Sequence, residues 1–143
     1  MKKKVLIVDD TLSWLKFNQN LLESLYPRMF EITVAKSAWD ARMVAVDNLE
    51  MPFDLIITDL QMDNFGDDTL AGEWLISQIQ ALREYSNTKI LIISGMPNIK
   101  MIAEQYNVAY ISKPRLVSNN NTLKMAMETF FPYLRIISKN TIL

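Results

Sequence analysis

Residues 4–10 read KVLIVDD, an apolar run that stops abruptly at two acidic residues. Four similar runs, rich in β-branched residues, follow at 32–35, 55–58, 90–93 and 108–111. Their positions are nearly all apolar and do not alternate with polar ones, which is typical of parallel strands that helices cover on both faces. The runs therefore predict five buried strands.

Apolar residues recur at helical spacing between the runs, first over residues 14–25 and up to Pro27. Ser37, with Asp40 three residues later, resembles a capping box and opens a second helix. The same spacing recurs over 75–82, 99–106 and 119–130. Asn107, at the end of the fourth pattern, suits a left-handed C-cap.

Strands alternating with amphipathic helices predict an α/β fold, namely a doubly wound parallel sheet with right-handed crossovers and helices on both faces. The flavodoxin-like strand order 2-1-3-4-5 is one of the two common outcomes. Periodicity alone does not choose between them.

Composition excludes several classes of function. The net charge is −1, with no basic stripe, so no nucleic-acid partner is expected. No apolar run approaches membrane-spanning length, and we expect a cytoplasmic protein without a membrane partner. The chain has no cysteine and no histidine, which excludes disulfides, thiolate metal sites and imidazole acid–base chemistry.

Acidic residues stand where the first and third strands end. Asp9 and Asp10 follow the first strand, and Asp59 follows the third. Parallel strands present their carboxyl ends at one edge of the sheet, and in the 2-1-3-4-5 order these two strands are neighbours. Each pair of carboxylates ~4 Å apart at an effective dielectric of ~20 would repel by about 4 kcal/mol. Such a cluster needs a cation, and oxygen-only ligands favour Mg²⁺.

Two further strand ends complete this set. Ser94 follows the fourth strand, and Lys113 follows the fifth. A hydroxyl, an ammonium and a metal around one carboxylate form an arrangement that binds a phosphoryl group. Aspartate carboxylates are an established class of nucleophile and become aspartyl-phosphates, which makes Asp59 a candidate acceptor.

Four short blocks carry a family resemblance: VLIVDD at 5–10, TDLQM at 58–62, ISG at 93–95 and YISKP at 110–114. In this order and at strand ends, they resemble the signature blocks of receiver domains of bacterial two-component response regulators. The resemblance covers roughly residues 2–131 and implies the 2-1-3-4-5 strand order.

The resemblance implies a phosphoprotein of two-component signal transduction. Asp59 would accept a phosphoryl group from a histidine kinase or a phosphotransfer protein, and Lys113 would contact that group. Asp10 would bind Mg²⁺ directly and Asp9 partly through water, with Asp59 and the backbone carbonyl of Gln61 as further ligands.

The resemblance also implies a switch. Ser94 and Tyr110 match the hydroxyl and aromatic positions that rearrange together on phosphorylation. The bond between Lys113 and Pro114 would be a cis peptide. Output would occur by protein–protein interaction on the face formed by the fourth helix, fifth strand and fifth helix, through which a homodimer could also form.

The chain departs from the usual receiver pattern in several places. Asp63 stands at a position where receivers usually have proline, and the segment over residues 63–70 is about five residues longer, with extra acids. The fourth helix is expected to be short, and Arg115 replaces an aromatic residue. The three tryptophans, Trp14, Trp39 and Trp74, are expected to serve packing.

We expect a receiver domain over residues 1–131 and a C-terminal tail over 132–143, with no separate output domain. The tail is apolar enough to dock on the fifth helix of its own domain, although contact with a partner is the alternative.

Two other functions remain open. The first is a receiver-like scaffold that is never phosphorylated. The second is an aspartyl-phosphate phosphatase of the haloacid dehalogenase type, which would need a second aspartate where Gln61 stands. The favoured interpretation is not an enzyme but a phosphoacceptor that assists its own phosphorylation and dephosphorylation.

Overall fold

The computed structural model of the chain describes residues 2–62 and 70–140. Within these residues a five-stranded parallel sheet has the order β2-β1-β3-β4-β5, so the predicted order is confirmed. The strands are β1 (Lys3–Val8), β2 (Phe30–Ala35), β3 (Leu55–Thr58), β4 (Lys89–Ser94) and β5 (Ala109–Ser112).

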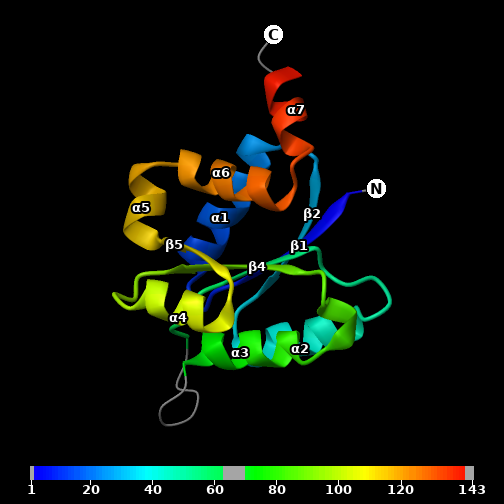
Figure 1. Cartoon of the computed structure of the whole chain (residues 1–143), viewed down its shortest axis with the longest axis vertical. Helices are drawn as coiled ribbons and strands as arrows, with labels where there is room; N and C mark the ends of the chain where they lie inside the picture. Colours follow the sequence, from blue (N-terminus) through cyan, green and yellow to red (C-terminus); the bar gives the residue numbers. More distant parts are fainter. Residues whose placement is uncertain (1, 63–69, 141–143) are drawn as a thin grey trace.

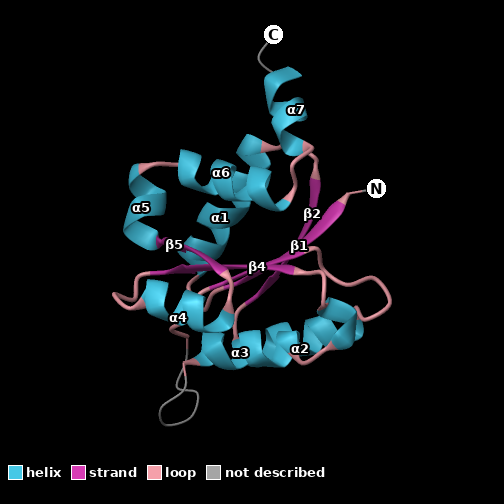
Figure 2. Cartoon of the chain, in the orientation of Figure 1, coloured by secondary structure: helices cyan, strands magenta, loops and turns pink. Residues whose placement is uncertain are grey.

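Helices cover both faces of the sheet, as Figures 1 and 2 show. On one face lie α2 (Ala38–Asp47), α3 (Ala71–Gln80), the short 3₁₀ helix η1 (Arg83–Tyr85) and α4 (Ile99–Tyr106). On the other lie α1 (Leu12–Leu25), α5 (Lys113–Ser118) and α6 (Asn121–Phe130), and α7 (Leu134–Asn140) extends from that layer. The fifth helix expected from sequence is therefore α6.

The predicted helix ends have a local cause. The Oγ atom of Ser37 accepts a hydrogen bond from the backbone N–H of Asp40 at 3.0 Å, which caps the start of α2. Asn107 ends α4 in the left-handed conformation, with φ 55° and ψ 51°. The eight-residue α4 is short, as expected.

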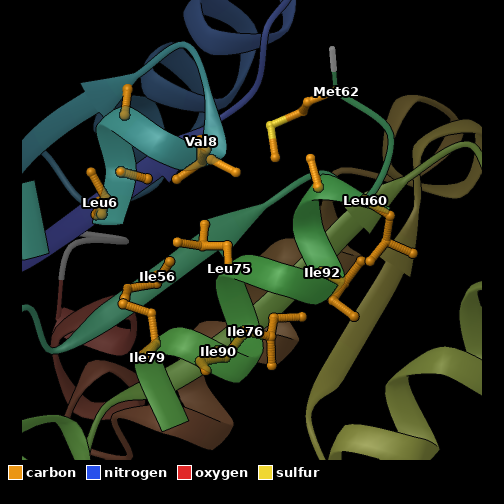
Figure 3. Packing of buried hydrophobic residues seen from close by; sticks show 14 of the residues in the cluster. Leu6, Val8, Ile56, Leu60, Met62, Leu75, Ile76, Ile79, Ile90 and Ile92 are labelled. Atoms are coloured by element: carbon orange, nitrogen blue, oxygen red, sulfur yellow. The ribbon is translucent and has the colours of Figure 1, made fainter. Parts of the chain in front are cut away.

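The apolar strands divide their side chains between two cores. Leu6, Ile56 and Ile92 point toward α3, where Leu75 and Ile79 meet them (Figure 3). The intervening strand residues join the opposite core with α1 and α6; they are Val5, Ile7, Leu55, Ile57, Leu91 and Ile93. Successive strand residues face opposite sides of a sheet, so a strand between two helical layers must be apolar at every position.

The predicted cis peptide at Lys113–Pro114 is wrong, because the described residues contain no cis bond. The chain passes directly from β5 into α5, whose first two residues are Lys113 and Pro114. Ser112 caps this helix by accepting a hydrogen bond from the N–H of Arg115. A helical turn needs trans peptides, and proline suits the first turn because the N–H it lacks has no partner there.

The C-terminal segment docks on its own domain, as expected. Leu134 in α7 is fully buried in the core formed by α1 and α6, and Ile137 packs partly against the same core. Ile136, on the outer side of α7, is 65% exposed. Across residues 2–62 and 70–140, no helix is both long enough and apolar enough to cross a membrane.

Candidate phosphoacceptor site

The sheet register places two of the predicted carboxylates side by side. Val8 of β1 pairs with Thr58 of β3, so Asp9 and Asp59 leave neighbouring strands at the same level. The backbone N–H of Asp59 continues the ladder by donating to the carbonyl of Val8 at 3.0 Å. Both side chains are buried.

Lys113 joins these carboxylates. Its Nζ atom lies 2.8 Å from Oδ2 of Asp59 and 3.1 Å from Oδ2 of Asp9. Only 15% of the Lys113 side chain is exposed, so both ion pairs are largely shielded from water. The structure thus brings together the predicted acceptor, one predicted metal ligand and the predicted phosphoryl-contacting lysine.

Burial and charge shift the pKa values of this group. Burial raises the pKa of Asp9, and the charge of Asp59 raises it further, against the hydrogen bond from the Thr11 N–H and the charge of Lys113. Burial alone would lower the pKa of Lys113, but hydrogen bonds and charges from Asp59 and Asp9 outweigh it and raise the pKa. Lys113 is therefore a firmly charged cation at neutral pH.

Backbone contacts fix the orientation of Asp59. Its Oδ1 atom accepts a hydrogen bond from the N–H of Leu60 at 2.7 Å, and its carbonyl accepts one from Oγ1 of Thr58 at 2.8 Å. The first turn of α3 packs on the same peptide: a Cβ atom on Gly72 would lie 2.2 Å from the Asp59 carbonyl oxygen. Gly72 is a supporting residue that sequence reasoning missed, because only the packing of α3 reveals it.

Asp10 does not join the other two carboxylates. Its side chain is exposed, and its Oδ1 atom accepts a hydrogen bond from the hydroxyl of Thr11 at 3.3 Å. Among the described residues, no group of three or more acidic side chains is placed to hold a metal ion. The expected convergence of three carboxylates is therefore reduced to two, because the Asp10 side chain is exposed and bonds with Thr11.

The two predicted switch residues occupy contrasting environments. Ser94 ends β4 and is fully buried, and its Oγ accepts a hydrogen bond from the N–H of Met96 at 3.2 Å. Tyr110, in the edge strand β5, is 37% exposed. Their coupled movement on phosphorylation stays a prediction.

Of the remaining predicted positions, Gln61 lies next to the Asp59 side chain. The N–H of Gln61 lies 3.4 Å from Oδ1 of Asp59, while the role of the Gln61 carbonyl stays a prediction. The extra acids of the long segment, Asp63, Asp67 and Asp68, fall outside the described residues.

An aromatic residue also borders the site. Trp14, in the first turn of α1, presents its ring to Lys113, whose Nζ lies 4.7 Å from the ring centroid. The expectation that the tryptophans serve packing alone is therefore incomplete for Trp14.

Comparison with solved structures identifies the architecture. A structure of chemotaxis protein CheY4 from Vibrio cholerae is similar over 92% of this chain and 100% of its own, with a TM-score of 0.68 and 22% identity. The chain has the receiver-domain fold. A signal receiver domain of an HD domain-containing protein from Pseudomonas fluorescens Pf-5 gives a TM-score of 0.70 at 21% identity, over 94% of this chain and 98% of that one.

The receiver fold recurs in a third similar structure, a CheY-like response regulator receiver domain protein from Methanospirillum hungatei JF-1. It matches 91% of this chain and 94% of its own, with a TM-score of 0.66 and 23% identity. No protein-family model and no curated protein matches the sequence. At these identities the similarity establishes the receiver fold, and function has to be argued from the site.

Proposed function

We propose that this chain is a phosphorylation-dependent signalling switch of the two-component type, with Asp59 as the phosphoacceptor. The observation that carries the proposal is the buried Asp59 carboxylate in contact with the ammonium of Lys113 at the carboxyl edge of the sheet. The chain contains no histidine, so the phosphohistidine donor would belong to a separate histidine kinase or phosphotransfer protein.

Phosphoryl transfer to Asp59 would be a single displacement. An oxygen of the Asp59 carboxylate attacks phosphorus, a P–O bond forms and the P–N bond of the donor breaks. The donor imidazole keeps the electron pair of that bond and takes up a proton. Lys113 would then offset the charge that gathers on the phosphoryl oxygens, and the N–H of Leu60 would keep the carboxylate in orientation.

The chemistry of the donor set fits Mg²⁺. Two buried carboxylates and one ammonium carry a formal net charge of −1, and their ligand atoms are all oxygens. We propose that Asp9, Asp59 and the Gln61 carbonyl would hold the ion and that Asp10 would join them by turning away from Thr11. When bound, Mg²⁺ supplies positive charge opposite the transferred phosphoryl oxygens.

Output would occur through protein contacts on the face formed by α4, β5 and α6. Each of the three elements has an exposed apolar side chain: Met101 in α4, Tyr110 in β5 and Met125 in α6. Phosphate on Asp59 would draw the hydroxyl of Ser94 toward the phosphoryl oxygens, and Tyr110 would then turn toward the protein, which would remodel this face. A homodimer through this face is the second use that we propose for it.

The test is labelling with acetyl phosphate and Mg²⁺, followed by mass spectrometry of peptides. We expect one phosphopeptide that contains Asp59, and we expect EDTA to abolish it. Asp59→Asn should remove the label, whereas Asp40→Asn, a change on the exposed side of α2, should keep it. A wild-type protein that takes no label under these conditions would favour the unphosphorylated scaffold.

A further inference from the structure

We propose that Trp14 is a positioning residue that holds Lys113 at the phosphoacceptor. The inference rests on the proposed function and adds a residue to its machinery. The Trp14 ring belongs to α1 and Lys113 opens α5, so the contact joins two elements on the same face of the sheet.

The contact completes the surroundings of the ammonium. A lysine ammonium has three N–H donors and no acceptor. Asp59 and Asp9 take two directions, at 2.8 and 3.1 Å, and the face of the Trp14 ring lies on a third side at 4.7 Å. Attraction between a cation and an indole face strengthens when both are shielded from water, and the Lys113 side chain is only 15% exposed.

A neutral partner has a specific advantage at this position. A third carboxylate would also hold Lys113, but it would add negative charge to a group whose formal net charge is already −1 and would repel the phosphoryl oxygens. The indole ring attracts the ammonium through its quadrupole and leaves the formal charge in place. Trp14 can therefore keep Lys113 aimed at Asp59 while its charge stays available.

Trp14 is itself held in place. Phe17, one turn along α1, meets it edge-to-face with ring centroids 5.4 Å apart and planes at 75°. Trp14 is partly buried against the core formed by α1 and α6. These contacts hold the Trp14 ring in one orientation beside Lys113.

A matched tryptophan is available as a control. Trp39 also stands in the first turn of a helix, α2, and stacks on Trp74 of α3 with ring centroids 5.3 Å apart. It belongs to the opposite helical layer from Trp14 (Figure 1). Trp39 is 55% exposed, so Trp39→Leu removes an indole from the first turn of a helix with little effect on the core and without touching Lys113.

The first measurement is NMR of the Lys113 side chain in the full chain, without any phosphodonor. Ring currents from Trp14 should displace the Lys113 εCH₂ resonance from its usual position. Trp14→Leu should abolish that displacement, Trp14→Phe should keep part of it, and Trp39→Leu should leave it unchanged. An undisplaced resonance in the wild-type protein would refute the contact, whatever the chain's function.

The second measurement is the affinity for beryllofluoride with Mg²⁺, together with the rate of labelling by acetyl phosphate. We expect Trp14→Leu to weaken both by about threefold to tenfold, as the loss of a shielded cation–ring contact implies. Trp14→Phe should recover at least half of the loss, and Trp39→Leu should stay within about twofold of wild type. Equal losses in Trp14→Leu and Trp39→Leu, or none in Trp14→Leu, would overturn the inference.

A chemical variant covers the case in which Trp14→Leu does not fold. In a Trp39→Phe/Trp74→Phe background, 5-fluorotryptophan replaces Trp14 alone and weakens the ring quadrupole with almost no change in shape. Labelling should slow relative to the same background with ordinary tryptophan, and an unchanged rate would refute the role. If the wild-type chain takes neither label nor beryllofluoride, the proposed function fails, while the resonance of Lys113 still decides the contact.

Discussion

The substitution Gly72→Ala should destabilise the protein and disturb Asp59 together. The added Cβ would lie 2.2 Å from the Asp59 carbonyl oxygen and 2.6 Å from Cα of Leu60. Both are backbone atoms, and the N–H of Gly72 donates to the Leu60 carbonyl at 3.0 Å. Neither partner can turn aside as a flexible side chain would, so α3 and the acceptor peptide must move apart.

The magnitude follows from two opposing effects. Alanine gains about 0.5–1 kcal/mol over glycine inside a helix, while forced overpacking costs about 1–3 kcal/mol, and more where backbone has to move. The carbon–carbon contact, at 2.6 Å, lies about 1 Å inside the normal separation of carbon atoms, and the contact with oxygen is shorter still. Because backbone has to move, we take the upper end of that cost and expect a net loss of about 2 kcal/mol, equivalent to a fall in Tm of roughly 4–8 °C for a domain of this size.

The control is Gly95→Ala, because a Cβ on Gly95 would meet nothing within 4 Å. Urea unfolding of both variants and the wild type would measure the free energies, and acetyl phosphate labelling would follow Asp59. Gly95→Ala should be neutral or slightly stabilising, by at most about 1 kcal/mol. If Gly72→Ala is as stable as Gly95→Ala and labels at the wild-type rate, the packing argument is wrong.

Three further predictions follow from the site and the tail. Burial and the charge of Asp59 raise the pKa of Asp9, so the native state binds the Asp9 proton more tightly than the unfolded chain does. The free energy of unfolding of the metal-free protein should therefore fall as the pH rises above 3.8, the ordinary pKa of Asp9. Asp9→Asn should raise the free energy of unfolding at neutral pH and flatten its fall with pH in urea titrations, and equal profiles for both proteins would contradict this. Mg²⁺ at one hundred times its Kd should add about 2.7 kcal/mol to the free energy of unfolding, reversibly with EDTA and less in Asp59→Asn. Leu134→Ala should lower the free energy of unfolding by about 2 kcal/mol or more, because Leu134 is fully buried. Ile136→Ala should change it by no more than about 0.5 kcal/mol in the same urea unfolding experiments.

The sheet was predictable because its signal is local. The composition of a run such as Leu55–Thr58 is enough to predict a strand, and the acidic residue after it indicates where the strand ends. The positions of Asp9, Asp59 and Lys113 followed from strand ends, which fix where the backbone goes. That is why these three residues lie where the sequence predicted.

Features that depend on side-chain direction or tertiary packing were not predictable in this way. The strand end located Asp10 but did not say that its carboxylate would face Thr11. The cis turn at Pro114 was expected from the family resemblance, and the six-residue α5 is too short for helical periodicity to have indicated a helix there. Trp14 and Lys113 are far apart in the sequence, and only the packing of α1 brings the indole to the ammonium.

The two apolar faces of the sheet have a consequence for strand alignment. In a sheet with one wet face, a slip by one residue exposes the core and is strongly penalised. Here a slip of β3 by one residue would exchange apolar residues between two apolar layers. Burial of apolar side chains alone therefore does not favour the correct alignment over the slipped one. The acids at the two ends of β3 distinguish the two alignments. Asp54 accepts a hydrogen bond from the backbone N–H of Lys4 at one edge, and Asp59 accepts one from the ammonium of Lys113 at the other. The carboxylate that is proposed to receive the phosphoryl group thus also fixes the alignment of β3 with its neighbours. Asp59→Leu should therefore weaken the pairing of β3 in addition to removing the ion pair with Lys113.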